Sequence, residues 1–240
     1  MRSHIIAAVI RLSLAFLLVS NVYAGDSGGA FVKGWNLSGN STVNPVNVST
    51  VFGTSATPVA GITPNVVAIW KWNAAGKSWQ LYTPVLSSTA LAAYATKHGV
   101  EVLSTINSGE AYWVNASAPF ALPAGVPADG TYTLTGADLV NGWNMAITGQ
   151  SIAPKDLNPT LQITYGSLPP VPGASAPATS TGFVSLWAWD STAKKWYFYA
   201  PSLDNGSGVL TNRIARWGLL DFTTAGKLLG PGVGFWVNMP

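Results

Sequence analysis

Short runs of β-branched and aromatic residues, separated by turn-forming residues, recur along the chain after residue 30. The runs "NVVAIWKW" and "SWQLYT" flank the short turn "NAAGK", so residues 65–83 are predicted to form a β-hairpin. The stretch "SLWAWDSTAKKWYFYA" at 185–200 repeats this pattern with a loop that lacks glycine. A further strand is predicted in "AYWVN" at 111–115 and in "GFWVN" at 234–238.

Helical signals are few. "TALAAYATKHG" at 89–99 combines Ala- and Leu-rich propensity with a Thr at its start and a Gly placed to end it, which predicts a helix. "VNPVNVSTVFG" at 43–53 predicts a short helix or a turn. The fold class expected is therefore mostly β, built from small antiparallel sheets that each carry a short helix.

The sequence contains an internal duplication. "GWNLSGNS" at 34–41 matches "GWNMAITGQS" at 142–151, "VVAIWKWNAAGKSWQLYTP" at 66–84 matches "FVSLWAWDSTAKKWYFYAP" at 183–201, and "SGEAYWVNAS" at 108–117 matches "PGVGFWVNMP" at 231–240. The helix at 89–99 has a weaker counterpart near 210–218. Matched blocks of this kind indicate two copies of one structural unit.

Ten of the 11 tryptophans fall into matched pairs, and only Trp217 lacks a tryptophan partner, since His98 is its counterpart. The pairs are Trp35 with Trp143, Trp70 with Trp187, Trp72 with Trp189, Trp79 with Trp196, and Trp113 with Trp236.

The matched blocks predict repeat one at 31–117, a linker at 118–130 and repeat two at 131–240. Residues 1–24 are predicted to be a signal peptide, from the N-terminal pattern described below. The Pro-, Ser- and Ala-rich stretch 167–182 occurs in repeat two alone and is expected to be an exposed loop. Two independent domains and one fused sandwich- or barrel-like body are both compatible with this pattern.

Side chains alternate along a strand, so Trp70 and Trp72 share a face with Ala68, while Val67, Ile69 and Lys71 share the other. The aliphatic face is expected to lie in the core. The tryptophan face has two interpretations: a packed layer or seam between the repeats, and an exposed aromatic platform for a ligand. Under the second interpretation the ligand-binding candidates are Trp70, Trp72, Trp79, Trp187, Trp189 and Trp196.

Asparagine follows tryptophan in both "GWN" blocks, at Asn36 and Asn144, and follows "WV" at Asn115 and Asn238. Amide side chains in such positions are expected to close turns or cap neighbouring backbone groups, although a role in ligand binding stays open.

The N-terminus and the composition indicate export. A positive start, the apolar run "LSLAFLLVS" and small residues before Gly25 are typical of a signal peptide cleaved after Ala24. Cleavage removes Arg2 and Arg11 from the 12 basic residues, leaving 10 against 9 acidic ones. No nucleic-acid partner is expected, because Lys and Arg are scattered rather than clustered. No later membrane span is expected, because no later segment is apolar for long enough. The chain has no cysteine and hence no disulfide.

The sequence gives little support for a catalytic site. No catalytic residue, metal site or cofactor is predicted, because the acidic residues are unmatched between the copies and the mature chain has His98 as its one histidine. The alternative is a secreted hydrolase with an asymmetric site at the repeat junction, using Glu101, Glu110 or His98.

The order "GWN", "WKWN…KSWQLYTP", "YATKHGVEVLSTI" and "SGEAYWVNA" resembles a Trp-rich repeat of secreted and surface proteins of bacteria. That repeat commonly runs as GWNL, W-x-W, W-x-FY-x-P and a closing GEGFWVN, and the resemblance covers most of both copies. It implies an extracytoplasmic, non-enzymatic module. Val233 replaces the acidic residue of the closing motif in repeat two, which weakens any site built on Glu110.

We therefore expect a secreted or cell-surface protein, located in the periplasm, on the cell surface or outside the cell, that acts as a binding or structural module. Carbohydrate or another protein is the expected partner class. A subunit of a surface assembly that makes contacts through strand edges is a third possibility.

Overall fold

A computed structural model of the chain describes residues 29–123, 130–162 and 182–240. The predicted signal peptide, residues 124–129 of the predicted linker and all but the last residue of the predicted loop 167–182 lie outside these residues. The described part is mostly β, as predicted, with two five-stranded sheets of similar size and a few short helices.

The first sheet comes from repeat one and has the strand order β2-β8-β4-β5-β6. Its neighbouring strands are antiparallel except for the parallel pairing of β5 with β6 at one edge, so the sheet is mixed. The strands are β2 (Gly34–Gly39), β4 (Val66–Asn73), β5 (Ser78–Tyr82), β6 (Glu101–Val102) and β8 (Ala111–Ala116).

The second sheet repeats this topology with the order β10-β14-β11-β12-β13, and its edge pair β12-β13 is again parallel. The chain's last strand, β14, lies between β10 and β11 inside the sheet. The strands are β10 (Gly142–Ala146), β11 (Ser185–Asp190), β12 (Lys195–Tyr199), β13 (Leu220–Asp221) and β14 (Phe235–Met239).

Two small ladders and the short helices complete the units. β1 (Ala30–Phe31) pairs with β9 (Phe120–Ala121), which lies in the stretch predicted to be linker, and β3 (Val46–Asn47) pairs with β7 (Thr105–Ile106). The α-helices are α1 (Val48–Phe52), α2 (Ser88–His98), α3 (Pro154–Leu157) and α4 (Val209–Trp217). Single 3₁₀ turns occur at η1 (Thr63–Asn65), η2 (Gly136–Asp138), η3 (Asn158–Leu161) and η4 (Pro201–Leu203).

Local sequence explains the elements that connect the strands. Helix α2 begins after Ser87, whose side chain accepts a hydrogen bond from the Ala90 N–H, and ends at Gly99, whose φ is 64°. The predicted helix at 89–99 is thus confirmed, and its N-cap is a serine two residues before the expected Thr. In both hairpins a lysine, Lys77 or Lys194, adopts the left-handed conformation that closes the turn. The second turn therefore needs no glycine.

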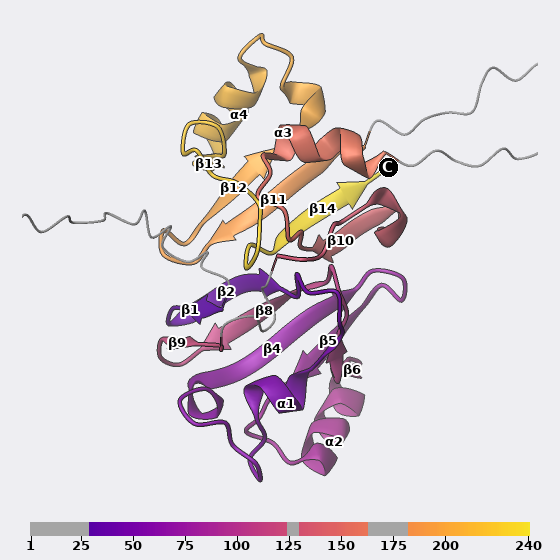
Figure 1. Cartoon of the computed structure of the whole chain (residues 1–240), viewed down its shortest axis with the longest axis vertical. Coiled ribbons are helices and arrows are strands. Elements are labelled where there is room, and N and C mark those ends of the chain that lie inside the picture. Colours follow the sequence, from indigo (N-terminus) through magenta and orange to yellow (C-terminus); the bar gives the residue numbers. More distant parts are fainter. Residues whose placement is uncertain (1–28, 124–129, 163–181) are drawn as a thin grey trace, which may run out of the picture.

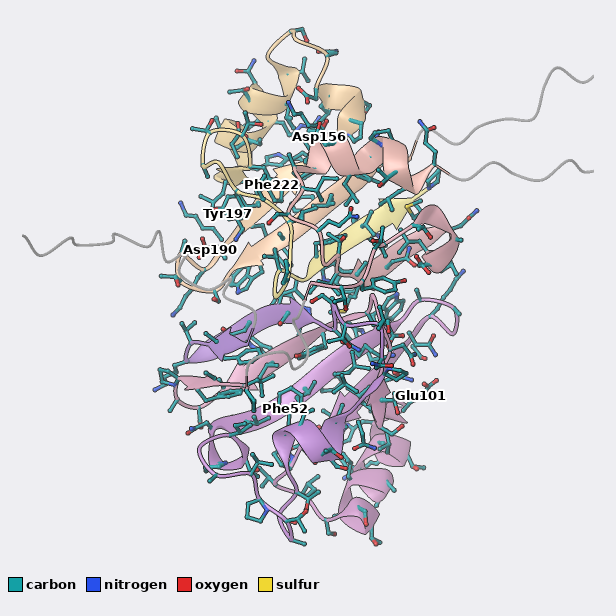
Figure 2. The ribbon with its side chains drawn as sticks, viewed as in Figure 1. Phe52, Glu101, Asp156, Asp190, Tyr197 and Phe222 are labelled. Atoms are coloured by element: carbon teal, nitrogen blue, oxygen red, sulfur yellow. The ribbon has the colours of Figure 1, made fainter. Side chains whose placement is uncertain are left out.

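The two units stack along the long axis of the molecule, with α1 and α2 at one end, α3 and α4 at the other, and both sheets between them (Figure 1). Each sheet has its own apolar core. In the first unit Phe52 of α1, labelled in Figure 2, packs against the fully buried Tyr112, with ring centroids 5.9 Å apart, and Ile69 belongs to the same buried cluster. In the second unit Tyr197 packs on Phe222, with ring centroids 5.0 Å apart (Figure 2).

One part of the predicted core face is wrong. Ile69 and its counterpart Leu186 are buried as expected, but Val67 is 43% exposed. The register of β4 against β8 shifts between Val66 and Ala68, so a bulge turns Val67 outward and buries Val66 instead. Val184, the counterpart of Val67, is also exposed.

Among the described residues, no helix has the length and apolar character needed to cross a membrane.

Candidate functional site: two tryptophan-lined grooves

Tryptophans gather on the inner faces of the sheets, where strand pairing aligns them. Trp72 faces Trp79 across the first hairpin, and Trp70 faces Trp113 on the neighbouring strand. The second sheet repeats this register, with Trp189 opposite Trp196 and Trp187 opposite Trp236. The two faces therefore carry the same array of indole rings.

The arrays meet at the seam between the units. Trp236 packs against Trp72 and Trp79 of the first unit, at centroid distances of 6.4 and 5.9 Å. In the mirrored contact, Trp113 packs against Trp189 and Trp196, at 6.1 and 5.7 Å. Leu37, Ala111 and Met145 are buried among these rings.

Two hydrogen bonds lock the seam symmetrically. The Trp72 Nε1–H donates to the carbonyl oxygen of Trp143 at 2.9 Å, and the Trp189 Nε1–H donates to that of Trp35 at 3.0 Å. The second tryptophan of each W-x-W motif thus satisfies a carbonyl in the GW motif of the other repeat. These carbonyls belong to the edge strands β10 and β2, so each unit covers a free sheet edge of the other.

Backbone hydrogen bonds also cross the seam. The Ile147 N–H donates to Gly109 O at 2.9 Å and the Tyr132 N–H donates to Ser41 O at 2.8 Å. At Gly234 an added Cβ would lie 2.4 Å from Ser38 O, so the absence of a side chain there permits the close approach.

The seam leaves two open grooves whose walls consist entirely of tryptophan. Groove 1, of about 460 Å³, is lined by Trp72, Trp79, Trp143, Trp187, Trp196 and Trp236. Groove 2, of about 560 Å³, is lined by Trp35, Trp70, Trp79, Trp113, Trp189 and Trp196. Exchanging each tryptophan for its partner in the other repeat converts one set into the other. Trp79 and Trp196 separate the grooves and line both.

Neither interpretation of the tryptophan face, as a packed layer or as an exposed platform, describes it completely. None of the 11 tryptophans is fully buried; Trp35 and Trp143 are each 45% exposed, and the other eight paired rings are half-buried. The same rings pack the seam through one part of their surface and line a groove through another. The structure brings all six predicted candidates to the grooves, and whether they bind a ligand stays a prediction.

Four groove residues were missed as candidates: Trp35, Trp113, Trp143 and Trp236. Their signal was present in the sequence, because each belongs to a matched pair. The hairpin alternation that singled out the other six does not extend to strands contributed from distant parts of the chain.

The asparagines of the two GW motifs close turns, as predicted. The Asn36 side chain accepts from the Val32 N–H and donates to Val32 O, at 2.9 and 2.8 Å. Asn144 makes the same pair of hydrogen bonds with Val140. These amides fix the approach to β2 and β10 and thereby position the exposed Trp35 and Trp143.

The residues considered for a hydrolase lie outside both grooves. Glu110 Oε2 is 2.6 Å from the Nζ of the buried Lys71 and also accepts from the Asn107 N–H. Glu101 lies at the sheet edge (Figure 2), where hydrogen bonds from Gln80 and then Ser78 lower the pKa of its carboxyl group.

His98 ends α2 and stacks on Tyr94, with ring centroids 4.1 Å apart. Within the described ranges, no group of three or more His, Asp or Glu side chains could hold a metal ion.

Comparison of the chain with models of known protein families, with curated proteins and with solved structures finds no match.

Proposed function

We propose that this chain is a secreted or cell-surface binding module without catalytic activity, which holds its ligand in the two tryptophan-lined grooves. One observation supports this function above the others: all ten paired tryptophans line a groove, and none of them is fully buried. Large aromatic surfaces left open to water are costly to maintain, and they are enriched at binding sites.

The ligand class is carbohydrate or protein. Both can offer compact rings that stack on indole, and both are met by a protein that leaves the cell. The resemblance to a Trp-rich repeat of bacterial surface proteins supports the same setting. A purely structural role as a seam between units accounts for the packed parts of the rings, but it leaves the open walls of both grooves unexplained.

The test uses the chain without residues 1–24 and follows tryptophan fluorescence and calorimetric heat during titration. A glycan array and an affinity capture of surface proteins supply candidate ligands. Trp35→Ala removes one wall of groove 2 and Trp143→Ala one wall of groove 1. Both side chains are exposed and their carbonyl oxygens stay in place, so the seam hydrogen bonds are retained.

We expect each substitution to remove binding at one groove, and the double variant to lose binding. Tyr94→Ala is the control, because Tyr94 is 40% exposed on α2, lines neither groove and has its ring against His98. A ligand that binds the double variant as well as the unchanged chain would refute the grooves as its site. If no glycan and no protein binds at all, the proposed function is wrong.

A further inference from the structure

The side chains that line the grooves offer hydrogen-bond donors and no acceptors. Among the described residues, tryptophan is the only residue type in either wall, and the one polar group of its side chain is an N–H donor. In groove 1 the Trp72 N–H is already used across the seam and the Trp187 N–H lies 3.4 Å from Ser185 Oγ. Within the part of the chain that the structure describes, four indole N–H groups of groove 1 have no hydrogen-bond partner, namely those of Trp79, Trp143, Trp196 and Trp236.

Groove 2 has the same character. The Trp189 N–H is used across the seam, and Trp70 and Trp113 have no partner for their indole N–H within the described ranges. None of these nitrogens is among the fully buried side-chain atoms that lack a hydrogen-bond partner. Each of them therefore keeps some contact with solvent.

The walls also lack charge and flatness. Among residues 29–123, 130–162 and 182–240, no charged side chain lines either groove. Neighbouring rings in the grooves meet at angles from 48° for Trp72 with Trp236 to 89° for Trp35 with Trp113. Such walls are notched, whereas a sugar ring stacks best on a single flat indole face.

From these observations we infer that each groove binds a proline-rich polypeptide segment in the polyproline II conformation; this inference rests on the proposed function. Proline has no backbone N–H, so a proline-rich segment presents carbonyl acceptors and apolar rings and needs no acceptor from its host. A sugar hydroxyl is both donor and acceptor, and its hydrogen would find no partner in these walls. Aromatic-lined grooves recognise polyproline II segments in the same way elsewhere, because that helix is preformed and leaves its carbonyls free.

The size of each groove fits a short segment. Volumes of about 460 and 560 Å³ lie within the range of about 300–1,000 Å³ that is usual for ligand sites. A polyproline II helix has three residues per turn, so every third residue meets the same wall. The pyrrolidine rings on that face fill the notches between angled indoles, and the indole N–H groups donate to the carbonyls between them.

The test titrates the chain without residues 1–24 with a capped decaproline peptide, a capped Gly-Ser decapeptide, cellohexaose and chitohexaose. We expect decaproline to bind at two sites and the Gly-Ser peptide not to bind. Trp35→Ala and Trp143→Ala should each weaken one site by about thirty-fold, which is typical of a tryptophan hot spot. Tyr94→Ala should change neither site.

Trp143→Phe keeps a ring in the wall of groove 1 but removes the N–H. It should weaken that site by about five-fold, as expected for the loss of one hydrogen bond. Because the walls are uncharged, affinity should not fall between low and high salt.

Each result decides between the proposals. If cellohexaose or chitohexaose binds in a way that Trp35→Ala and Trp143→Ala abolish, and decaproline does not, the polyproline inference is overturned while the proposed function stands. Decaproline binding that the double variant leaves unchanged also overturns the inference. If neither peptide, glycan nor surface protein binds, both proposals fail.

Discussion

The ion pair between Lys71 and Glu110 offers the sharpest test of the packing, because the second repeat shows what replaces it. Lys71 Nζ and Glu110 Oε2 are 2.6 Å apart, and the two side chains are 6% and 31% exposed. At the matched positions repeat two has Ala188 and Val233, both buried in its core. An ion pair with one buried and one partly exposed partner in the first unit thus corresponds to a buried apolar pair in the second.

A double-mutant cycle exploits this correspondence. Glu110→Val leaves the ammonium group of Lys71 buried without its carboxylate, which should lower the free energy of unfolding by about 3–5 kcal/mol. Lys71→Ala leaves a carboxylate that is partly exposed and still accepts from the Asn107 N–H, so about 1–3 kcal/mol is expected. The double variant carries the residue pair of repeat two and removes both charges together. Its cost should be only about 1–2 kcal/mol.

Urea unfolding at 25 °C, followed by tryptophan fluorescence, measures all three variants. The expected result is a coupling energy of about 2 kcal/mol or more between the two sites. Lys33→Ala, a change of the same kind at an exposed position, should stay within about 0.5 kcal/mol of the unchanged chain. Effects of Glu110→Val and Lys71→Ala that add within about 0.5 kcal/mol would refute the reasoning.

Three other predictions concern stability. Deleting 234–240 removes β14 from the middle of the second sheet and should abolish the cooperative thermal unfolding of that unit, as seen by circular dichroism; an unchanged melting curve would contradict the observed topology. Gly234→Ala places a Cβ 2.4 Å from Ser38 O and should cost about 1–3 kcal/mol in urea unfolding, whereas Gly230→Ala, whose Cβ would first meet a side-chain oxygen at 3.3 Å, should cost less. Burial lowers the pKa of Lys227 from 10.5 to about 8, so between these values the unfolded chain binds more protons and stability should rise with pH, by up to about 1.4 kcal/mol per unit. Lys227→Met should abolish the rise between pH 8 and 9.5, and a rise that persists in this variant would assign it to another group.

Features encoded over short distances could be predicted from the sequence. Turn residues and alternation mark the hairpin of β4 and β5, and Gly99 marks the end of α2. Asn36 and Asn144 bond to backbone groups four residues away, which is the range over which an amide next to a turn acts. The duplication then doubles each of these signals.

Features that depend on distant partners could not be predicted. Alternation separates the two faces of β4 but does not say what covers either face. The burial of Lys71 depends on Glu110, which lies 39 positions away. The bulge at Val67 follows from pairing with β8, a strand that the chain reaches only after α2 and two further short strands.

The seam also changes how the matched tryptophans are interpreted. Each groove takes four rings from one unit and two from the other, so a single unit would contain neither groove. The hydrogen bond from Trp72 to the Trp143 carbonyl and its counterpart from Trp189 hold the units in the one arrangement that forms both grooves. Packing and groove therefore require the same tryptophans at the same positions. The presence of these six seam rings in both copies is then no argument for core over binding surface, because loss of one of them, such as Trp113 or Trp236, would weaken the seam and open a groove wall at once.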